Sequence, residues 1–536
     1  MRGWSAWWMV LALIASGCRS QPGTTATVIT EEVRPTRAPS SGDASLILMA
    51  DIGGVLKPCG CTVDLQKGGF DRLKPFVDAE RARTEHILLL HAGPVFFESH
   101  HDDPNKAPQK ARQSEVVAQL VGEVGIDIAG LSAHDISAAR DGIKGGIKGL
   151  IDDARLKMVT GNVSASATGV EAPAYRVEQV GDLRVGVFSL TNTAEGVEVA
   201  DARTNAEQIV EKLKVEADVI VLLRGLGLRN TKRLLRAVPG IHFAVAGGLG
   251  DQPVASDEAE LVGDSRLVQF HREGRYIGRL KLHMVAGSTD FVDASAPGQD
   301  EVKDLEQRIA QLEQDLARWK TDRDPADRAV RSASHHLEVL KKTRANIEGA
   351  DTSVPEGRSY FSFRSTSLEW DLPQDPGVVT VMDAFNEELK QIHLANAGTL
   401  PEPVPGQALY VGQQECIDCH EETETFWAND RHPLAWETLE DDGKTFDAGC
   451  VSCHVTGYGE ASGSLVGQTE GREDVQCEAC HGPGSLHVEA DGEGHIVRDP
   501  GEEVCTTCHN AKHSPKFDYQ KWKKQIVVPG HGLALK

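Results

Sequence analysis

Cys416-Ile417-Asp418-Cys419-His420 is the first of four Cys-x-x-Cys-His strings in the C-terminal quarter of the chain. The other three are Cys450-Val451-Ser452-Cys453-His454, Cys477-Glu478-Ala479-Cys480-His481 and Cys505-Thr506-Thr507-Cys508-His509. Two thiols at this spacing can form thioether bonds with the two vinyl groups of one haem, and the adjacent His then reaches the iron. Zinc sites and disulfides would use the cysteines but leave the recurring His unexplained. The strings therefore predict four covalent c-type haems, with His420, His454, His481 and His509 as proximal ligands.

The composition around these strings supports the same interpretation. Residues 409–536 contain 10 Lys and Arg against 23 Asp and Glu, and they hold 9 of the 20 His of the chain. Gly is frequent and long periodic segments are absent. We expect a domain of short helices and irregular chain over 409–536, whose core consists mostly of porphyrin.

Five further His lie in this segment, namely His432, His487, His495, His513 and His531. A second His on a haem iron gives a low-spin electron-transfer centre, whereas an open position allows a small ligand to bind. From the residues alone, each of these His is equally compatible with a surface position and with a ligand.

The segment also resembles the cytochrome c554-type tetrahaem cytochromes linked to hydroxylamine oxidation. The matching strings are Tyr410-Val411-Gly412, Arg431-His432, Trp436-Glu437-Thr438-Leu439, Cys453-His454-Val455-Thr456-Gly457-Tyr458-Gly459, Val475–His487 and Ser514-Pro515-Lys516-Phe517-Asp518-Tyr519. The resemblance implies that His432, His487 and His531 are distal ligands. It also implies that one haem, the second, is five-coordinate.

Before this segment lie a linker and a helical hairpin. Thr399–Gly406 contains three prolines, and residues 351–408 are assigned to a connecting segment and linker. Within residues 299–350, apolar residues recur at spacings of three and four on both sides of Asp324-Pro325, which predicts two antiparallel helices. Such a hairpin can be a spacer that packs on itself or a dimerisation element.

Residues 45–298 alternate between apolar strand candidates and helical stretches, which predicts a layered α/β domain. The expected strands are Ser45–Ala50, His86–Leu90, Ile126–Leu131, Lys157–Thr160, Leu183–Leu190, Asp218–Leu223, Ile241–Ala246 and Arg279–Val285. Another strand is expected at Tyr360–Trp370 and a helix at Val379–His393.

This domain resembles the calcineurin-like metallophosphatases of the 5′-nucleotidase type. The strings that carry the resemblance are Leu46–Gly54, Leu88–Pro94, Ser132–Asp135, Leu222–Gly225 and Ala246–Gly250. The family pattern is retained at Asp51, His134 and Asp135. It is lost at Gly53, Pro94, Ala133, Arg224, Gly248 and Gly250. Two-metal hydrolysis requires a full ligand set, so we expect a domain without catalytic metals, with a mononuclear remnant as the alternative.

Cys59 and Cys61 lie in the loop after the first expected strand. Pro58-Cys59-Gly60-Cys61 with Lys67-Gly68-Gly69-Phe70 resembles a subgroup of these phosphatase-like proteins, many of them fused to multihaem cytochromes. A redox or structural pairing and a metal site remain equally open.

The first residues are typical of an export signal. Met1–Gly17 has a short basic start and an apolar run too short to span a bilayer, and it ends before Cys18. Ala15-Ser16-Gly17-Cys18 resembles a bacterial lipobox, which implies a lipid-anchored Cys18. The alternative is a plain signal peptide. Residues 18–44 are expected to form a flexible tether.

These expectations define a multidomain, exported protein of the bacterial periplasm or cell envelope. The net charge of −24 argues against nucleic-acid binding. It favours basic redox partners, such as basic cytochromes or quinone-linked complexes, and the oligomeric state stays open. The expected function is electron transfer through four haems. The alternatives are a haem oxidoreductase acting on nitrogen oxides at the five-coordinate iron, or a metal-dependent nucleotide hydrolase.

Overall fold

Alternating apolar residues form the strands of the N-terminal part of the fold. In β1 (Gly42–Met49), Leu46 and Leu48 are buried on one face, while Ile47 and Met49 are buried on the other. Successive side chains of a strand point to opposite faces of its sheet, so such a strand requires cover on both sides.

The computed structural model describes residues 40–57, 66–97, 106–139, 143, 145–164, 169–193, 196–247, 258–288, 290–295, 299–322, 328–347, 356–510, 513–514, 516–527 and 531. All of these residues belong to one compact unit of the fold. The expected signal segment, Cys18, Cys59 and Cys61 lie outside the described residues.

Two mixed sheets face each other. The seven-stranded sheet has the order β12-β13-β11-β1-β2-β3-β4, and the six-stranded sheet has the order β5-β6-β7-β8-β10-β9. The further strands of the first sheet are β2 (Ile87–His91), β3 (Ile128–Gly130), β4 (Lys157–Val159), β11 (Tyr276–Met284), β12 (Val292–Asp293) and β13 (Tyr360–Ser367). Those of the second are β5 (Tyr175–Val180), β6 (Leu183–Thr191), β7 (Val219–Gly225), β8 (Phe243–Ala246), β9 (Glu260–Val262) and β10 (Ser265–Gln269).

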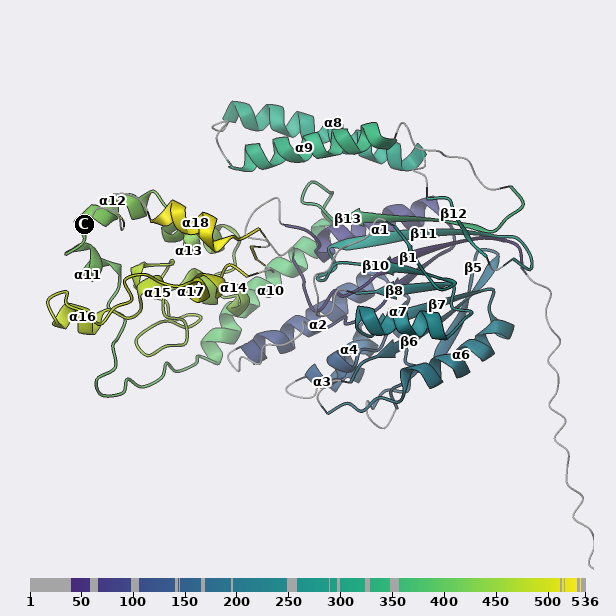
Figure 1. Ribbon diagram of the computed structural model, residues 1–536, viewed down its shortest axis with the longest axis horizontal. Helices are drawn as coiled ribbons and strands as arrows, with labels where there is room; N and C mark the ends of the chain where they lie inside the picture. The colour runs from purple at the N-terminus through teal and green to yellow at the C-terminus, as the bar shows by residue number, and fades with distance from the viewer. Residues whose placement is uncertain are drawn as a thin grey trace, which may run out of the picture. The chain divides into compact units, whose positions relative to one another are not determined.

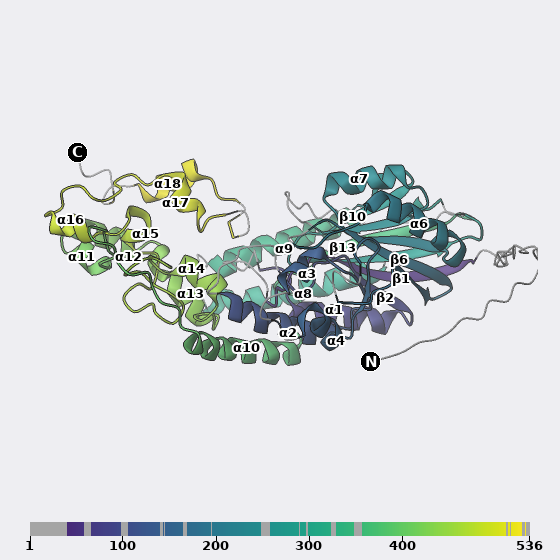
Figure 2. The ribbon, with the colours of Figure 1, turned by 90° about the horizontal axis from the view of Figure 1, so that it is seen from below.

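Helices cover the outer face of each sheet, which gives four layers. Figure 2 shows α6 and α7 on one side of the strands, with α1, α2 and α4 on the other. The buried residues follow this division, because one apolar cluster lies between the sheets and one lies under each helical layer. The helices are α1 (Phe70–Arg83), α2 (Ala107–Val124), α3 (Ala133–Ala138), α4 (Gly146–Asp153), α6 (Ala202–Glu216) and α7 (Leu228–Ala237). We call these two sheets and their helices the α/β region.

The eight strands expected between residues 45 and 298 are confirmed as β1, β2, β3, β4, β6, β7, β8 and β11. Parallel pairs join β1, β2, β3 and β4 in the first sheet and β6, β7 and β8 in the second, where β8 also pairs in parallel with β10. The layered α/β class predicted from the alternating elements is therefore confirmed.

The stretch 351–408 contributes more to the α/β region than a connecting segment would. β13 pairs with β11 in antiparallel register from Tyr276 opposite Ser367 to His283 opposite Tyr360. The following helix α10 (Pro376–Ala395) buries Met382 and Leu389 in the apolar cluster under the first sheet. The sequence predicted both elements, but their assignment to a connector is corrected, since their apolar faces complete this core.

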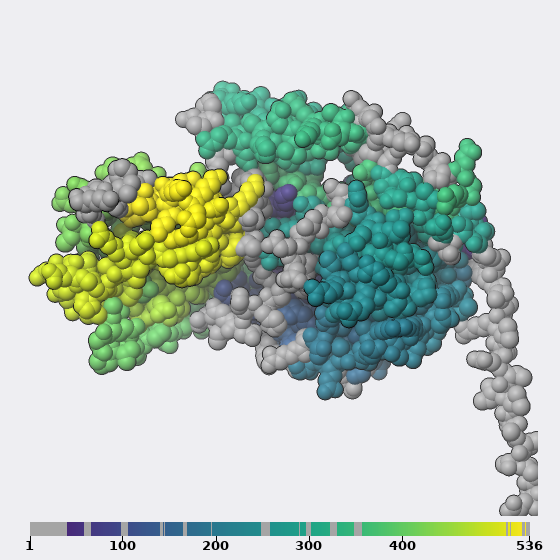
Figure 3. Space-filling model, viewed as in Figure 1, coloured from purple at the N-terminus to yellow at the C-terminus, as the bar shows by residue number. Residues whose placement is uncertain are grey.

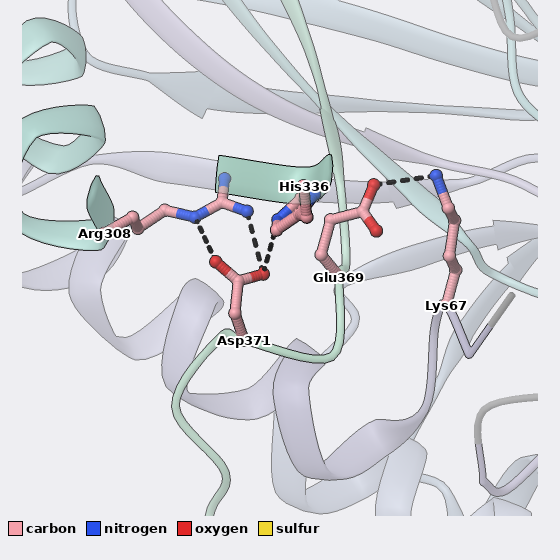
Figure 4. Close-up of polar contacts among 5 residues, drawn as sticks. All are labelled: Lys67, Arg308, His336, Glu369 and Asp371. Atoms are coloured by element: carbon pink, nitrogen blue, oxygen red, sulfur yellow. Dashed lines mark hydrogen bonds and ion pairs between the residues drawn. The ribbon is translucent and has the colours of Figure 1, made fainter. Parts of the chain in front are cut away.

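The expected hairpin consists of α8 (Gln299–Asp322) and α9 (Arg328–Ile347). Leu305, Leu312 and Leu316 of α8 pack against apolar residues of α9, so the repeating apolar stripe is buried within the hairpin itself. Asp371, which follows β13, accepts hydrogen bonds from Arg308 at 3.0 Å and from His336 at 3.2 Å (Figure 4). A second ion pair in Figure 4, between Lys67 and Glu369 at 2.7 Å, holds the same segment to the loop before α1.

The C-terminal region, residues 409–536, is built from short helices, coloured green to yellow in Figures 1 and 3. They are α11 (Gln413–Ile417), α12 (Glu421–Ala428), η3 (His432–Leu434), α13 (Ala435–Asp441), α14 (Ala448–His454), α15 (Cys477–His481), α16 (Ser485–Glu489), α17 (Glu502–Thr506) and α18 (Tyr519–Ile526). The apolar cluster formed by its described residues is small and is centred on Leu439, Val451 and Val466. This agrees with the prediction of short helices around a small side-chain core.

Among the described residues, no helix combines the length and the apolar character that crossing a membrane requires.

Candidate functional site: four haem-attachment motifs

Each Cys-x-x-Cys-His motif starts in or coincides with a short helix. The motifs beginning at Cys450 and Cys477 lie in α14 and α15, and those beginning at Cys416 and Cys505 start in α11 and α17. In the first and fourth motifs the His N–H bonds the carbonyl of the first Cys, at 2.9 Å for His420 and 2.8 Å for His509. The helical turn thus brings the proximal His close to both thiols of its own motif.

Three proximal imidazoles each face a second imidazole from a distant part of the chain. The ring centroids are 6.4 Å apart for His420 and His487, 6.1 Å for His509 and His432, and 6.1 Å for His481 and His531. The first pair is nearly parallel, with an interplanar angle of 12°, whereas the other two pairs are nearly perpendicular, at 83° and 84°.

This spacing fits one iron between each pair of rings. An imidazole nitrogen binds a metal at about 2 Å, so two rings on opposite sides of one ion hold their centroids roughly 6.3 Å apart. Direct stacking of two rings would allow closer approach, as for Phe426 on His531 at 4.9 Å. The residues present therefore fit three bis-histidine haems.

The second ring nitrogen of most of these His is held by a neighbouring acceptor. Nδ1 contacts the Val497 carbonyl at 2.6 Å in His481, the Gly494 carbonyl at 2.7 Å in His487 and the Ile526 carbonyl at 3.0 Å in His531. A metal-binding His usually donates its other N–H in this way, which fixes its tautomer and leaves Nε2 for the metal. The same arrangement occurs at His432, His454 and His509, whose Nδ1 atoms contact Asp430, the Ala435 carbonyl and Ser514.

His454 differs from the other three proximal His. Its Nδ1 is fixed by the Ala435 carbonyl at 2.5 Å, but among the described residues no second imidazole faces its ring. His495 is exposed. The second motif therefore differs from the other three in the surroundings of its proximal His.

Contacts between cysteines show which motifs are neighbours. A hydrogen bond with the Cys477 thiol raises the pKa of Cys416, so the first motif adjoins the third. Burial, together with the nearby Cys505 thiol, raises the pKa of Cys480 to about 11, which places the third motif beside the fourth. Cys508 contacts Cys453 and shares a hydrogen bond that raises its pKa, so the fourth motif adjoins the second.

Helix α12 and the turn after it carry three residues beside the imidazoles that are neither Cys nor His. Phe426 stacks on His531, and Trp427 stacks on His432 at 5.6 Å with an interplanar angle of 4°. Asp430 accepts a hydrogen bond from His432 Nδ1 at 2.6 Å, which is the main reason why its pKa is lowered to about 2. The sequence signal was an aromatic pair within a segment that is otherwise acidic and poor in apolar residues.

The helix of the second motif is fixed by a side chain of α2. Asp447 caps the start of α14, and Gln109 donates its amide to Asp447 Oδ1 at 2.7 Å. The Gln109 carbonyl oxygen accepts the backbone N–H of Ala448 at 2.9 Å and lies 3.2 Å from His393 Nε2 of α10. Gln109 is buried, so these contacts are shielded from water.

The phosphatase-like positions of the α/β region lie where its parallel strands end. Asp51 follows β1, and Arg224 is the next-to-last residue of β7. The Arg224 guanidinium is buried, which lowers its pKa to about 10 against the opposing effect of the Asp51 charge, and it donates to the Gly247 carbonyl at 3.4 Å. A buried cation therefore lies near Asp51, one of the retained carboxylates.

Asp135 is committed to the backbone. Its oxygens accept the N–H groups of Val95, Phe96 and Phe97 at 2.8–3.1 Å, and burial raises its pKa to about 6 against those bonds. The backbone N–H of His134 bonds the capping hydroxyl of Ser132. In the part of the chain that the structure describes, no group of three or more His, Cys, Asp or Glu is arranged to hold a metal ion.

Comparison with known proteins supports the motif assignment. Residues 415–482 match the family model described as "Cytochrome c554 and c-prime". This part of the chain is cytochrome c554-like. The cytochrome c554-like part includes the first three motifs, together with His432.

One curated relative is cytochrome c-554 of Nitrosomonas europaea, 29% identical over 102 residues. This alignment covers 16% of the present chain and 43% of the relative, so the chain spans less than half the length of that cytochrome.

Solved structures similar to the chain include a 5′-nucleotidase precursor, a sulfate thiohydrolase and a calcineurin-like phosphoesterase. A 5′-nucleotidase precursor from Thermus thermophilus is 16% identical, with a TM-score of 0.43, and the match covers 69% of this chain and 61% of that one. The sulfate thiohydrolase SoxB of Thermus thermophilus is 14% identical, with a TM-score of 0.44, and the match covers 73% of this chain and 69% of that one. The calcineurin-like phosphoesterase YfkN of Bacillus subtilis is 15% identical, with a TM-score of 0.41, and the match covers 66% of this chain and 100% of that one. The fold class given above rests on the strand order and layers of the chain itself.

Proposed function

We propose that the C-terminal region binds four covalent haems and that the protein transfers electrons between redox partners. The observation that carries the proposal is the spacing of three imidazole pairs at 6.1–6.4 Å, each including the His of a Cys-x-x-Cys-His motif. Bis-histidine haem iron changes its charge without exchanging ligands, which suits rapid one-electron transfer. The chain supplies the eight thiols and orients the imidazoles through their Nδ1 contacts.

The contacts between cysteines suggest a path for the electrons. The motifs adjoin one another in the order first, third, fourth, second, from Cys416 through Cys477, Cys480, Cys505 and Cys508 to Cys453. In this order the two ends of the chain of haems are the one at His420 and the one at His454. Cys419 is exposed, so the first haem is the better candidate for exchange with a partner.

The partner is expected to be basic and the location to be outside the cytoplasm. Residues 409–536 have 23 acidic and 10 basic residues, and this excess would attract a basic cytochrome or a quinone-linked complex at low salt. Export through the N-terminal segment, with a lipid anchor at Cys18, would place the protein at the bacterial envelope.

A second function is favoured by His454, whose ring faces no second imidazole among the described residues. The iron at this motif would keep an open position, which nitrogen oxides could occupy. Titration with cyanide or nitric oxide distinguishes the two functions. A spectral change at one haem supports ligand chemistry, whereas four unchanged haems leave electron transfer alone.

For the α/β region we propose a non-catalytic role. Asp135 is bonded to three backbone N–H groups, and the Arg224 cation lies near Asp51, where the related phosphatases would bind metal. Metal-dependent phosphate release from nucleotides in Mn²⁺ or Zn²⁺ would contradict this role and favour a hydrolase.

Haem analysis of the purified protein tests the main proposal. We expect four haems per chain by pyridine haemochrome assay and mass spectrometry, and reversible reduction of all four in a potentiometric titration. Fewer than four attached haems would contradict it.

A further inference from the structure

Trp427 has a buried hydrogen-bond donor that the described residues leave without an acceptor. Its side chain lies in α12 and is 8% exposed, and its indole Nε1 has no hydrogen-bond partner among the described residues. A buried indole N–H usually finds a partner, because an unmade bond costs about 1–3 kcal/mol. A group outside the described residues, such as a bound cofactor, would supply that acceptor.

The place of Trp427 limits what that acceptor can be. The indole is parallel to the His432 ring at 5.6 Å and lies 6.3 Å from the His531 ring, so it is beside the candidate ligands of two irons. Glu424 and Asp430 each lie three residues from Trp427 along the chain, and Asp430 is already bonded to the ring and the backbone N–H of His432, at 2.6 and 3.0 Å. The carboxylates of a haem bound at His432 are acceptors of suitable chemistry for this place.

We propose that the Trp427 indole N–H donates a hydrogen bond to a carboxylate of the haem whose iron His432 binds. The inference rests on the proposed function, since it requires haem in the C-terminal region. Trp427 is then a positioning residue with two actions: its ring fixes the plane of His432, and its N–H holds one edge of the haem.

The bond has a consequence for the redox chemistry. A carboxylate near the iron favours the oxidised state, because its negative charge stabilises the extra positive charge of the metal. A hydrogen bond from a donor disperses part of that negative charge. Loss of the N–H should therefore favour Fe(III) and lower the midpoint potential of this one haem.

The test uses the full-length holoprotein and two matched variants. Trp427→Phe keeps an aromatic ring beside His432 but removes the donor. Trp436→Phe is the control, because Trp436 is half-buried in α13 and its Nε1 already donates to Glu440 at 3.2 Å. Midpoint potentials are measured by redox titration with electron paramagnetic resonance, and the relevant signal is the low-spin one that His432→Ala abolishes.

We expect Trp427→Phe to raise the Fe(III)/Fe(II) ratio of that haem about twofold to tenfold at a fixed potential. This factor corresponds to the net free energy of one typical hydrogen bond. Trp436→Phe should leave all four potentials unchanged, and Trp427→His, which keeps a ring N–H, should restore much of the wild-type potential. Four haems with wild-type potentials in Trp427→Phe would overturn the inference but leave the proposed function intact. Fewer than four haems in the wild type would instead defeat the proposed function.

A measurement on the wild type covers the case in which Trp427→Phe does not retain its haems. Ultraviolet resonance Raman spectroscopy reports hydrogen bonding at indole N–H groups. A Trp band that responds to haem reduction supports the bond to the haem carboxylate. Indole bands that are identical in the ferric and ferrous protein would overturn it.

Discussion

Glu478 Oε2 accepts the backbone N–H of Gly412 at 2.7 Å, and this bond joins the third haem motif to the chain just before the first. The two carboxylate oxygens also accept N–H groups from Val411 at 2.9 and 3.1 Å and from Gly484 at 2.8 Å. Glu478 is 1% exposed, so one buried carboxylate satisfies three backbone donors. The segments that carry His420 and His481 are thereby fixed to each other.

We predict that Glu478→Gln destabilises the C-terminal region by about 1.5–3 kcal/mol, the value of a hydrogen bond to a charged group. In Gln an NH2 group replaces one carboxylate oxygen, and this donor would face a backbone N–H with which it cannot form a hydrogen bond. Guanidinium unfolding followed by haem absorbance measures the loss. Glu489→Gln, at an exposed position of α16, is the control and should change the stability by less than about 0.5 kcal/mol.

The attachment of the hairpin should depend on pH through Asp371. Burial would raise the pKa of this carboxyl, but the hydrogen bonds from His336 and Arg308 outweigh burial and hold its pKa well below the usual value. A lowered folded pKa contributes stability above the unfolded value near ~3.9, and that stability is lost as the pH falls through the folded pKa. We expect the ionised Asp371 to stabilise the attached hairpin by on the order of 2–3 kcal/mol at pH 7, and this free energy to decline progressively below about pH 5.

Hydrogen exchange in α8 and α9, measured from pH 7 down to about pH 2 and corrected for the intrinsic pH dependence of amide exchange, measures this attachment. Asp371→Asn should remove most of the pH dependence and raise exchange at pH 7, because it leaves Arg308 unpaired in a largely buried site. Asp315→Asn, which breaks a surface ion pair with Arg318, should behave like the wild type. Equal exchange in all three proteins would show that Asp371 does not hold the hairpin.

His432→Ala should convert one haem from low spin to high spin without loss of any haem. In the proposed arrangement Cys505 and Cys508 would attach this haem, whereas His432, whose ring lies 6.1 Å from that of His509, would supply only a second ligand to the iron. Electron paramagnetic resonance should therefore gain one high-spin signal. His495→Ala changes an exposed His and should leave the spectrum as it is. An unchanged spectrum in His432→Ala would remove this residue from the ligand set.

Gln109→Leu should loosen the helix of the second motif. The change leaves Asp447 and the buried N–H of Ala448 without their partner, at a cost of about 1–3 kcal/mol, so hydrogen exchange in α14 should accelerate roughly tenfold to a hundredfold. Gln119→Leu on the same helix removes only an exposed contact with Glu123 and provides the control. Equal exchange in the two variants would mean that α14 is held by its own region alone.

Local patterns predicted much of this architecture, and tertiary contacts account for the rest. Alternation in segments such as Leu183–Leu190 predicts a strand, because a buried strand is apolar on each covered face. The same pattern cannot reveal that β13 lies beside β11, since that pairing joins residues separated by the whole hairpin. Short or partly polar strands such as β9 and β12 carry too few residues for a period to be recognised.

The haem motifs show the same division. Spacing within each Cys-x-x-Cys-His string selects the proximal His, since that chemistry is local. Which distal His faces which proximal one depends on how the region folds, as in the pairing of His420 with His487. Trp427 and Gln109 have no motif at all, and their contacts appear only when α12 and α2 are placed in the fold.

Electron paramagnetic resonance of the fully oxidised holoprotein counts its low-spin and high-spin irons and so tests the ligand set. We predict three low-spin irons and one high-spin iron, the latter at His454. The His420–His487 pair, with nearly parallel rings, should give a rhombic low-spin signal, and the two nearly perpendicular pairs should give signals with a large maximum g-value. Four low-spin irons, or fewer than three, would contradict the ligand assignment on which the account rests.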